Sequence, residues 1–134
     1  MEVMYLLDTN TCIFSINQKS TKAIENIRTK SREGIYISAL TVAELEYGVS
    51  FSTFPERNRI SLVKFLSIFN ILNFDDSDAV EYGKIKAELR RQGKVFGPID
   101  MLLAAQAISK GLVFITNNTS EFQNVPGVVL EDWK

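Results

Sequence analysis

The sequence predicts an α/β fold with a central, mostly parallel, twisted sheet of about four to five strands and helices on both faces. Short apolar runs alternate with helical patterns along the whole chain, which is typical of this class. The first run, residues 3–7, is apolar on both faces, as a buried parallel strand requires. The 134 residues, 46% of them hydrophobic, can bury one core. We therefore expect one domain over residues 1–134.

The first half of the chain contains two predicted strands, residues 3–7 and 35–37. Helices are expected over residues 9–16 and 20–30, from residues 38–41 onward, and from Pro55, which suits a first helical position. Ser20 or Thr21 is the expected N-cap of the second helix and Gly34 its end. The apolar positions of the third helix, Val42, Leu45 and Val49, are expected to face the core.

The second half continues the alternation, with a strand at residues 71–74 and a long helix that ends near Gly93. Asp75, Asp76 or Ser77 is the expected cap of that helix. The pair Gly97-Pro98 breaks the chain before a helix over residues 99–109, which Gly111 ends. A strand at 112–115, a polar turn at 116–119 and a short strand at 128–130 complete the prediction.

Three acidic residues occupy unusual positions. Asp8, Glu44 and Asp100 are each the lone charge in an apolar segment, with no adjacent Lys or Arg. Asp8, Glu44 and the turn at Thr116 come after predicted strands, and ligands of parallel sheets bind at the carboxyl ends of the strands. Asp100 lies at a helix start, so its convergence with the others is the least direct expectation.

Carboxylates that lie close together need a cation to offset their mutual repulsion. Carboxylates about 5 to 6 Å apart repel by roughly 3 kcal/mol per pair at an effective dielectric constant near 20. The chain has no histidine and one cysteine, which excludes Ser-His-Asp and Cys-His catalysis and zinc sites built on those residues. Oxygen ligands favour Mg²⁺ or Mn²⁺. The chemistry implied is metal-assisted phosphodiester hydrolysis without a covalent intermediate.

Each acid also has a local explanation. Asp8 can cap the helix that begins at Thr9, Asp100 can favour its own helix dipole, and Glu44 can face solvent beside Glu46. The joint placement of the three favours a shared site.

The net charge of −1 gives no global basic field, so nucleic-acid binding would need a local patch. The candidate RNA-binding residues are Lys84, Lys86, Arg90, Arg91 and Lys94. Alternatively, they form the solvated face of an amphipathic helix. Cys12 is expected in the core, and one cysteine gives no sign of an oxidising compartment. The longest apolar runs are far shorter than the roughly 20 residues of a membrane span, so we expect a cytoplasmic protein.

Four stretches in order resemble the PIN-domain ribonucleases, and more closely the VapC toxins of VapBC type II toxin–antitoxin systems. They are Leu6-Leu7-Asp8-Thr9-Asn10, residues 38–48 with Thr41 and Glu44, Gly97-Pro98-Ile99-Asp100, and residues 113–122 with Thr116-Asn117-Asn118. The resemblance makes residues 1–134 one PIN domain. It implies a toxin that is an Mg²⁺- or Mn²⁺-dependent endoribonuclease and acts on structured RNA, often tRNA. Initiator tRNA is the first substrate to try.

Carried over by position, the resemblance makes Asp8, Glu44, Asp100 and Asn118 the catalytic residues and Asp8 and Asp100 the metal ligands. Many relatives have an acid where this chain has Asn118, so the number of metals stays open. Glu121 is a candidate substitute for that acid, and Asn10, Thr116 and Asn117 are candidate supporting residues.

The resemblance also implies a homodimer and a VapB-type antitoxin, with DNA bound only indirectly through the antitoxin complex. Phe51 and Phe54 are candidates for apolar surface buried between chains, or for ordinary core contacts. Tyr47 and Trp133 are interpreted as packing residues.

Three alternatives remain for comparison. A receiver domain needs an acidic pair after its first strand, and a haloacid-dehalogenase-like phosphatase needs an Asp where this chain has Asn10. A non-catalytic α/β interaction or signalling module with an acidic pocket is the third, although the chain has no closely spaced glycines for a phosphate-cradling loop. Only the ribonuclease interpretation predicts metal-dependent cleavage of RNA.

Overall fold

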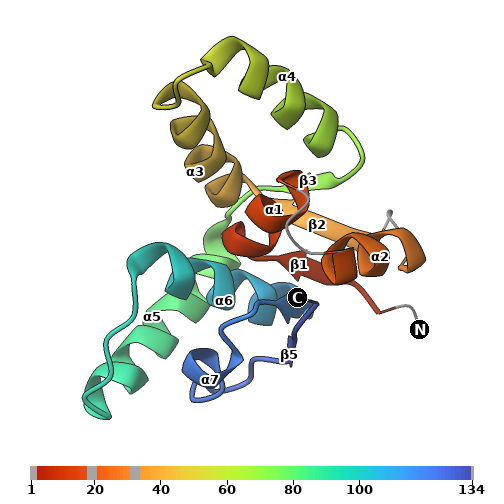
Figure 1. Cartoon of the computed structure of the whole chain (residues 1–134). Helices are drawn as coiled ribbons and strands as arrows, with labels where there is room; N and C mark the ends of the chain where they lie inside the picture. Colours follow the sequence, from red (N-terminus) through yellow and green to blue (C-terminus); the bar gives the residue numbers. More distant parts are fainter. Residues whose placement is uncertain (1–2, 18–20, 31–33, 134) are drawn as a thin grey trace.

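The computed structural model describes residues 3–17, 21–30 and 34–133, in which five strands form one parallel sheet (Figure 1). The strand order is β3-β2-β1-β4-β5, so the first strand is central. The strands are β1 (Tyr5–Leu7), β2 (Ile35–Ser38), β3 (Asn70–Leu72), β4 (Val113–Ile115) and β5 (Leu130–Glu131). The predicted fold class is confirmed.

The helices alternate with these strands along the chain. Their bounds are α1 (Thr9–Ile16), α2 (Thr21–Thr29), α3 (Ala39–Ser50), α4 (Pro55–Leu66), α5 (Asp76–Arg91), α6 (Pro98–Lys110) and α7 (Thr119–Phe122). Within the described ranges no helix is long and apolar enough to cross a membrane.

Two apolar cores lie on the two sides of the sheet. Leu6 and Phe114 pack with buried side chains of α5, α6 and α7, among them Leu89 and Leu103. Leu7, on the opposite side, packs with residues of α1 to α4, including the fully buried Cys12. Because successive side chains of a strand point to opposite faces, β1 contributes to both cores, and the expectation of helices on both faces is confirmed.

Local signals fix most helix ends as predicted. Ser38 Oγ accepts a hydrogen bond from Leu40 N at the start of α3, and Pro55 and Pro98 open α4 and α6. Gly111 ends α6 at φ 69°, a left-handed conformation that glycine adopts without strain. Asp75 caps α5 in a capping box with Asp78.

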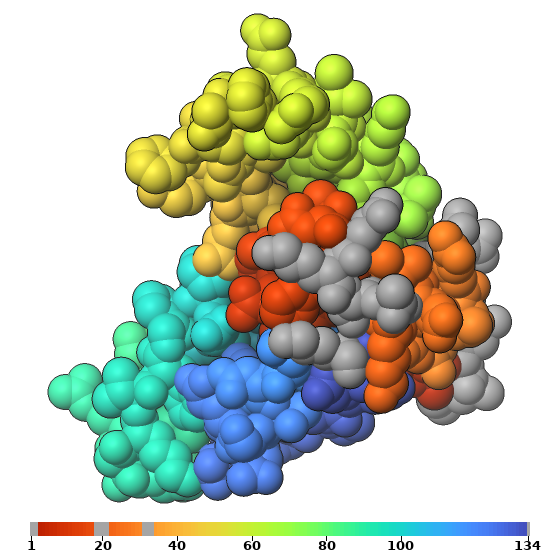
Figure 2. Space-filling model, viewed as in Figure 1, coloured from red at the N-terminus to blue at the C-terminus, as the bar shows by residue number. Residues whose placement is uncertain are grey.

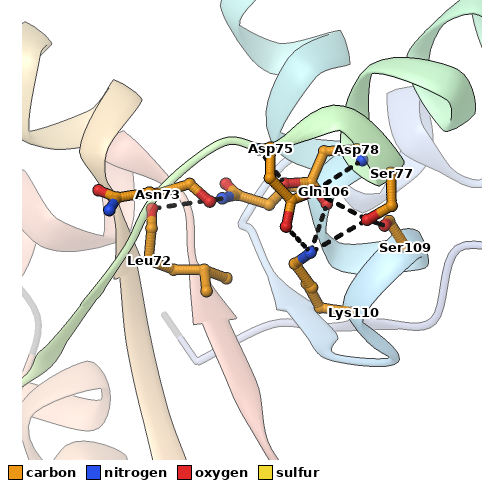
Figure 3. A network of polar contacts seen from close by, with 8 residues as sticks. All are labelled: Leu72, Asn73, Asp75, Ser77, Asp78, Gln106, Ser109 and Lys110. Carbon is orange, nitrogen blue, oxygen red and sulfur yellow. Dashed lines mark hydrogen bonds and ion pairs between the residues drawn. The ribbon is translucent and has the colours of Figure 1, made fainter.

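A polar network ties α5 and α6 to the end of β3 (Figure 3). Lys110 Nζ forms ion pairs with Asp75 and, at 3.3 Å, with the fully buried Asp78. Gln106, also fully buried, donates from Nε2 to the carbonyl oxygens of Leu72 and Asn73 at 3.3 and 3.2 Å. Buried polar groups are tolerated when they are paired in this way.

Several predicted boundaries need correction. The third strand covers Asn70–Leu72 rather than 71–74, and the last covers Leu130–Glu131 rather than 128–130. The second helix ends at Thr29, before Gly34, and its predicted cap at Ser20 lies outside the described residues. These short edge strands are defined by pairing with their neighbours, which a single-strand pattern does not contain.

Candidate active site

The carboxyl edge of the sheet assembles the site from consecutive strand ends. Leu7 pairs with Ile37 on one side and Ile115 on the other, and Asp8 N donates to Ile115 O at 2.9 Å. Asp8, Ser38 and Thr116 directly follow Leu7, Ile37 and Ile115. They therefore lie side by side at the same edge of the sheet. This is the edge at which parallel sheets bind ligands.

Asp8 is the most buried acid of the site, at 5% exposure. Its Oδ1 accepts a hydrogen bond from Thr11 N at 2.7 Å and caps α1. The capping role proposed as the local explanation is thus real, and it coexists with a place in the site. Burial raises the pKa of Asp8, and the charge of Asp132 adds to this, whereas hydrogen bonds from Thr11 and Thr116 oppose it.

A cleft of about 490 Å³ brings the three sequence-predicted acids together. Asp8, Thr9 and Asn10 line it from the start of α1, Glu44 from α3, and Ile99 and Asp100 from the start of α6. Figure 2 shows a hollow between α3 and α6, with α1 at its base. The convergence of Asp100 with the other acids, the least direct expectation, is confirmed in position.

The acids influence one another electrostatically. Burial raises the pKa of Asp100, and the charges of Glu121, Asp8 and Glu44 raise it further, in that order. These three carboxylates come from segments far apart in the sequence. Asp100 is therefore held in a field that opposes its own ionisation, which a bound cation would relieve.

Threonine and asparagine side chains hold the outer carboxylates in place. Thr9 Oγ1 donates to Glu44 Oε1 at 2.6 Å and lies 3.2 Å from Thr41 Oγ1, which joins α1 to α3. Asn118 Nδ2 donates to Glu121 Oε2, and Thr116 Oγ1 accepts from Asn118 N at 3.1 Å. Asn118 is therefore bonded to Glu121, the residue that the sequence analysis named as the candidate substitute acid.

The remaining predicted supporting residues lie near the same edge. Asn10 is exposed and lines the cleft. Asn117 is half-buried in the turn after β4, and within the described chain its Oδ1 atom is buried without a hydrogen-bond partner. Glu44 is exposed, as its local explanation expected, yet its carboxylate turns toward Thr9.

Sequence reasoning missed three contributors and misread another. It assigned no role to the hydroxyl of Thr9, and although it named Glu121 it did not predict the short helix α7 that carries this residue. It also missed Asp132, which follows β5 at the same sheet edge and could have been found by the rule that found Asp8. Tyr47 is not a packing residue, because it is 68% exposed and lines the cleft. Trp133 is buried against Tyr5, as predicted.

More apolar side chains of α3, α4 and the loop between them are exposed than the sequence indicated. The core-contact alternative for Phe51 and Phe54 is wrong, because both are exposed, Phe51 by 80%. The rings of Tyr47 and Phe51 stack with their centroids 5.8 Å apart. Ile60 and Val63 of α4 are exposed as well. The hairpin of α3 and α4 therefore carries several exposed apolar side chains, of which Tyr47 lines the cleft.

The donor set fits a hard divalent ion. Carboxylate and amide oxygens are the ligands that Mg²⁺ and Mn²⁺ prefer, and Asp8, Glu44 and Asp100 bring three carboxylates to one cleft. Within the described residues no three acidic or cysteine side chains are close enough to enclose an ion. The carboxylates thus surround a cleft rather than form a finished coordination shell.

The chain matches known proteins over nearly its whole length. The PIN-domain profile matches residues 5–128. The chain is 42% identical to the tRNA(fMet)-specific endonuclease VapC of Salmonella typhimurium over 129 residues, 96% of this chain and 97% of the relative. It is 36% identical to Ribonuclease VapC2 of Rickettsia felis, with 98% of each chain covered. The chain belongs to the PIN-domain family, among the VapC proteins.

Solved VapBC structures confirm the PIN fold of this VapC-family chain. VapBC2 of Rickettsia felis bound to a promoter DNA fragment matches with a TM-score of 0.90 at 34% identity, covering 98% of this chain and 100% of that one. DNA-bound VapBC of Salmonella typhimurium matches with a TM-score of 0.90 at 40% identity, with 98% and 99% covered. The fold of this chain, with its five-stranded parallel sheet, is thus that of a PIN domain.

Proposed function

We propose that this VapC-family chain is the toxin of a type II toxin–antitoxin pair and cleaves RNA as a metal-dependent endoribonuclease. The observation that carries the proposal is the cleft that Asp8, Glu44 and Asp100 line together. An acidic cleft of this kind would repel RNA phosphates unless a divalent ion bound first. Metal dependence follows from that requirement.

Asp8 and Asp100 are the proposed ligands of Mg²⁺ or Mn²⁺, with Glu44, Glu121 and Asn118 around them. The ion, when bound, would lower the pKa of a water ligand and neutralise charge on the attacked phosphate. The chain's own residues set the geometry: Thr11 and Thr116 orient Asp8, Thr9 orients Glu44, and Asn118 orients Glu121. Glu44 is placed at the rim, where it can accept a proton from an attacking water.

The substrate and partners are proposed from the relatives. The Salmonella typhimurium relative is named for tRNA(fMet), so initiator tRNA is the first RNA to test. The solved relatives are VapBC complexes bound to DNA, which supports a VapB-type antitoxin. We propose that this chain meets DNA only through that antitoxin. The apolar face of α3 and α4 supports burial by a second copy or by the antitoxin. We place this activity in the cytoplasm, where tRNA is found.

Cleavage of a tRNA pool tests the proposal. We expect the purified chain to cut initiator tRNA with Mg²⁺ or Mn²⁺, and EDTA to stop the reaction. Asp100→Asn should abolish cleavage, whereas Asp76→Asn, which removes an exposed carboxylate of α5, should cut at the wild-type rate. Equal cleavage by Asp100→Asn, or cleavage that persists in EDTA, would show that the site is misassigned. The absence of any metal-dependent turnover would favour a binding module.

Calorimetry tests the ligands separately. Asp8→Asn should weaken the divalent-ion isotherm, and an unchanged isotherm would remove Asp8 from the ligand set.

A further inference from the structure

A second pocket lies outside the acidic cleft, between the end of α5 and the start of α6. It has a volume of about 300 Å³, and its lining is Lys86, Arg90, Lys94, Val95, Phe96 and Met101. A cavity of this volume is at the small end of ligand sites and can hold a ribose or a nucleobase. The cations of this pocket are three of the five candidate RNA-binding residues.

The turn that ends α5 fixes the position of Lys94 relative to Lys86 and Arg90. Gly93 adopts φ 73°, its N–H donates to Arg90 O at 3.0 Å, and Lys94 N donates to Leu89 O at 2.9 Å. These two bonds form a Schellman motif, which ends a helix and turns the chain back along it. Lys94 is therefore presented beside Arg90 by backbone structure, not by a freely moving loop.

The pocket cations have no carboxylate partner. Among the residues that the structure describes, no ion pair involves Lys86, Arg90 or Lys94. The nearby acid Glu88 bonds instead to Arg91 and Gln92. Lys86 and Arg90 are four residues apart on α5, a spacing at which like charges destabilise a helix, and Lys94 adds a third positive charge just beyond the helix end. Lys86 Nζ donates to Tyr82 Oη at 3.3 Å, a neutral partner, so the three cations form a local excess of positive charge in a chain of net charge −1.

The walls suit a nucleotide rather than a simple anion. Phe96 packs against Phe122, with the ring centroids 5.9 Å apart, so the aromatic wall is anchored in the core. Val95 is 93% exposed at the pocket rim. Cations next to aromatic and apolar surface are the combination with which proteins bind single-stranded nucleic acid.

The position of the pocket connects it to the cleft. Met101, which lines the pocket, directly follows Asp100, which lines the cleft. The segment between α5 and α6 runs from the far end of α5 back to the start of α6 (Figure 1). The cleft and the pocket therefore share the first turn of α6 in their walls.

We infer that the pocket formed by Lys86, Arg90, Lys94 and Phe96 is an anchoring subsite for single-stranded RNA next to the cleaved bond. The inference rests on the proposed ribonuclease function. The cations bind one or more phosphates outside the scissile one, and the apolar wall covers the adjoining sugar or base. The subsite offsets the repulsion that RNA meets at the acids and sets its direction across the cleft.

Binding to a short fluorescein-labelled oligouridylate in EDTA, followed by anisotropy over a series of salt concentrations, tests this subsite. Each phosphate contact on a single strand contributes about 0.7 to the slope of log K against log salt. For the double variant Arg90→Gln/Lys94→Gln we expect the slope to fall by about 1.4 and Kd at low salt to rise about tenfold. The matched control, Lys22→Gln/Lys64→Gln, changes net charge equally at exposed sites on α2 and α4 and should bind as wild type does.

The outcomes separate this subsite from the nuclease proposal. An unchanged slope and Kd in Arg90→Gln/Lys94→Gln would overturn the subsite even if wild type cleaves RNA with Mg²⁺. An equal loss in the control variant would also overturn it, because only bulk charge would matter. Loss of binding to polyglutamate with unchanged RNA binding would assign the pocket to an acidic protein and overturn it too. If the slope falls as expected but wild type cleaves no RNA, the nuclease proposal fails and the RNA contact stands.

Discussion

The acidic cleft predicts that removing one of its charges will stabilise the metal-free protein. Asp100 meets repulsion from Glu121, Asp8 and Glu44. Because Asp100 is only half-buried, solvent screens each interaction, and we take about 0.5 kcal/mol for each, the size of exposed charge pairs. Summed over the three interactions, Asp100→Asn should raise the free energy of unfolding by about 1.5 kcal/mol. For a chain of 134 residues this corresponds to a rise in Tm of about 5 °C.

Thermal unfolding by circular dichroism in EDTA measures this effect, and the control is Asp76→Asn. Asp76 lies in the first turn of α5, where its charge favours the helix dipole, so its loss should lower Tm slightly. Divalent ions supply a second measurement, since an ion at ten times its Kd stabilises the folded state by about 1.4 kcal/mol. Mg²⁺ should raise the Tm of wild type much more than that of Asp100→Asn.

A Tm of Asp100→Asn equal to or below that of wild type in EDTA would refute the reasoning. It would mean that the carboxylates do not repel one another in solution, and the case for a shared cation would be lost. A gain in stability together with lost RNA cleavage would show that the protein gives up stability to keep these charges together.

Three further predictions concern the residues that support the site and the fold. Thr9→Val keeps the side-chain shape but removes the donor to Glu44, so RNA cleavage should fall about tenfold while Tm changes little. The control Thr9→Ser keeps the hydroxyl and should retain activity. Equal cleavage rates in the two variants would show that Thr9 is not a positioning residue. Asp78→Ala deletes a fully buried member of the capping box and should cost about 2 kcal/mol in urea unfolding, and a loss no larger than that of Asp76→Ala would contradict this role. Hydrogen bonding from Lys110 holds the pKa of Asp75 below its ordinary value, so the pair stabilises the folded state. This stabilisation is fully present at pH values above the ordinary pKa of Asp, about 4, and is lost as the pH falls through the lowered pKa of Asp75. Because Asp75 raises the pKa of Lys110, the same contribution is also lost as pH rises through the raised pKa of Lys110. The stability difference between wild type and Asp75→Asn should therefore be largest near neutral pH, and a difference independent of pH would exclude the ion pair.

The sequence was sufficient for elements whose signals are local. Asp8, Ser38 and Asp75 each cap the helix that follows, and Pro55, Pro98 and Gly111 mark helix ends, so these boundaries were predictable within a residue or two. Asp8 was predictable as a site residue because the end of an apolar run in a parallel sheet is also the edge at which ligands bind.

Features that depend on distant contacts were not predictable in this way. The helix with Glu121 spans four residues, too short for a periodic pattern. The strand β5 is defined by its pairing with β4, and the exposure of Tyr47 and Phe51 depends on how far the hairpin of α3 and α4 stands from the sheet. The contact of Thr9 with Glu44 joins residues 35 positions apart, and no local pattern contains it.

The strand β1 has only three residues, yet Leu6 and Leu7 belong to different cores, and both neighbours of the strand are bonded to it. Loosening either layer of helices must therefore disturb the same few peptide groups, so partial opening of one half of the molecule is disfavoured. The amide protons of this strand should exchange with solvent only when the whole chain unfolds. Asp8, the next residue, is thereby kept in place by packing from both sides of the sheet.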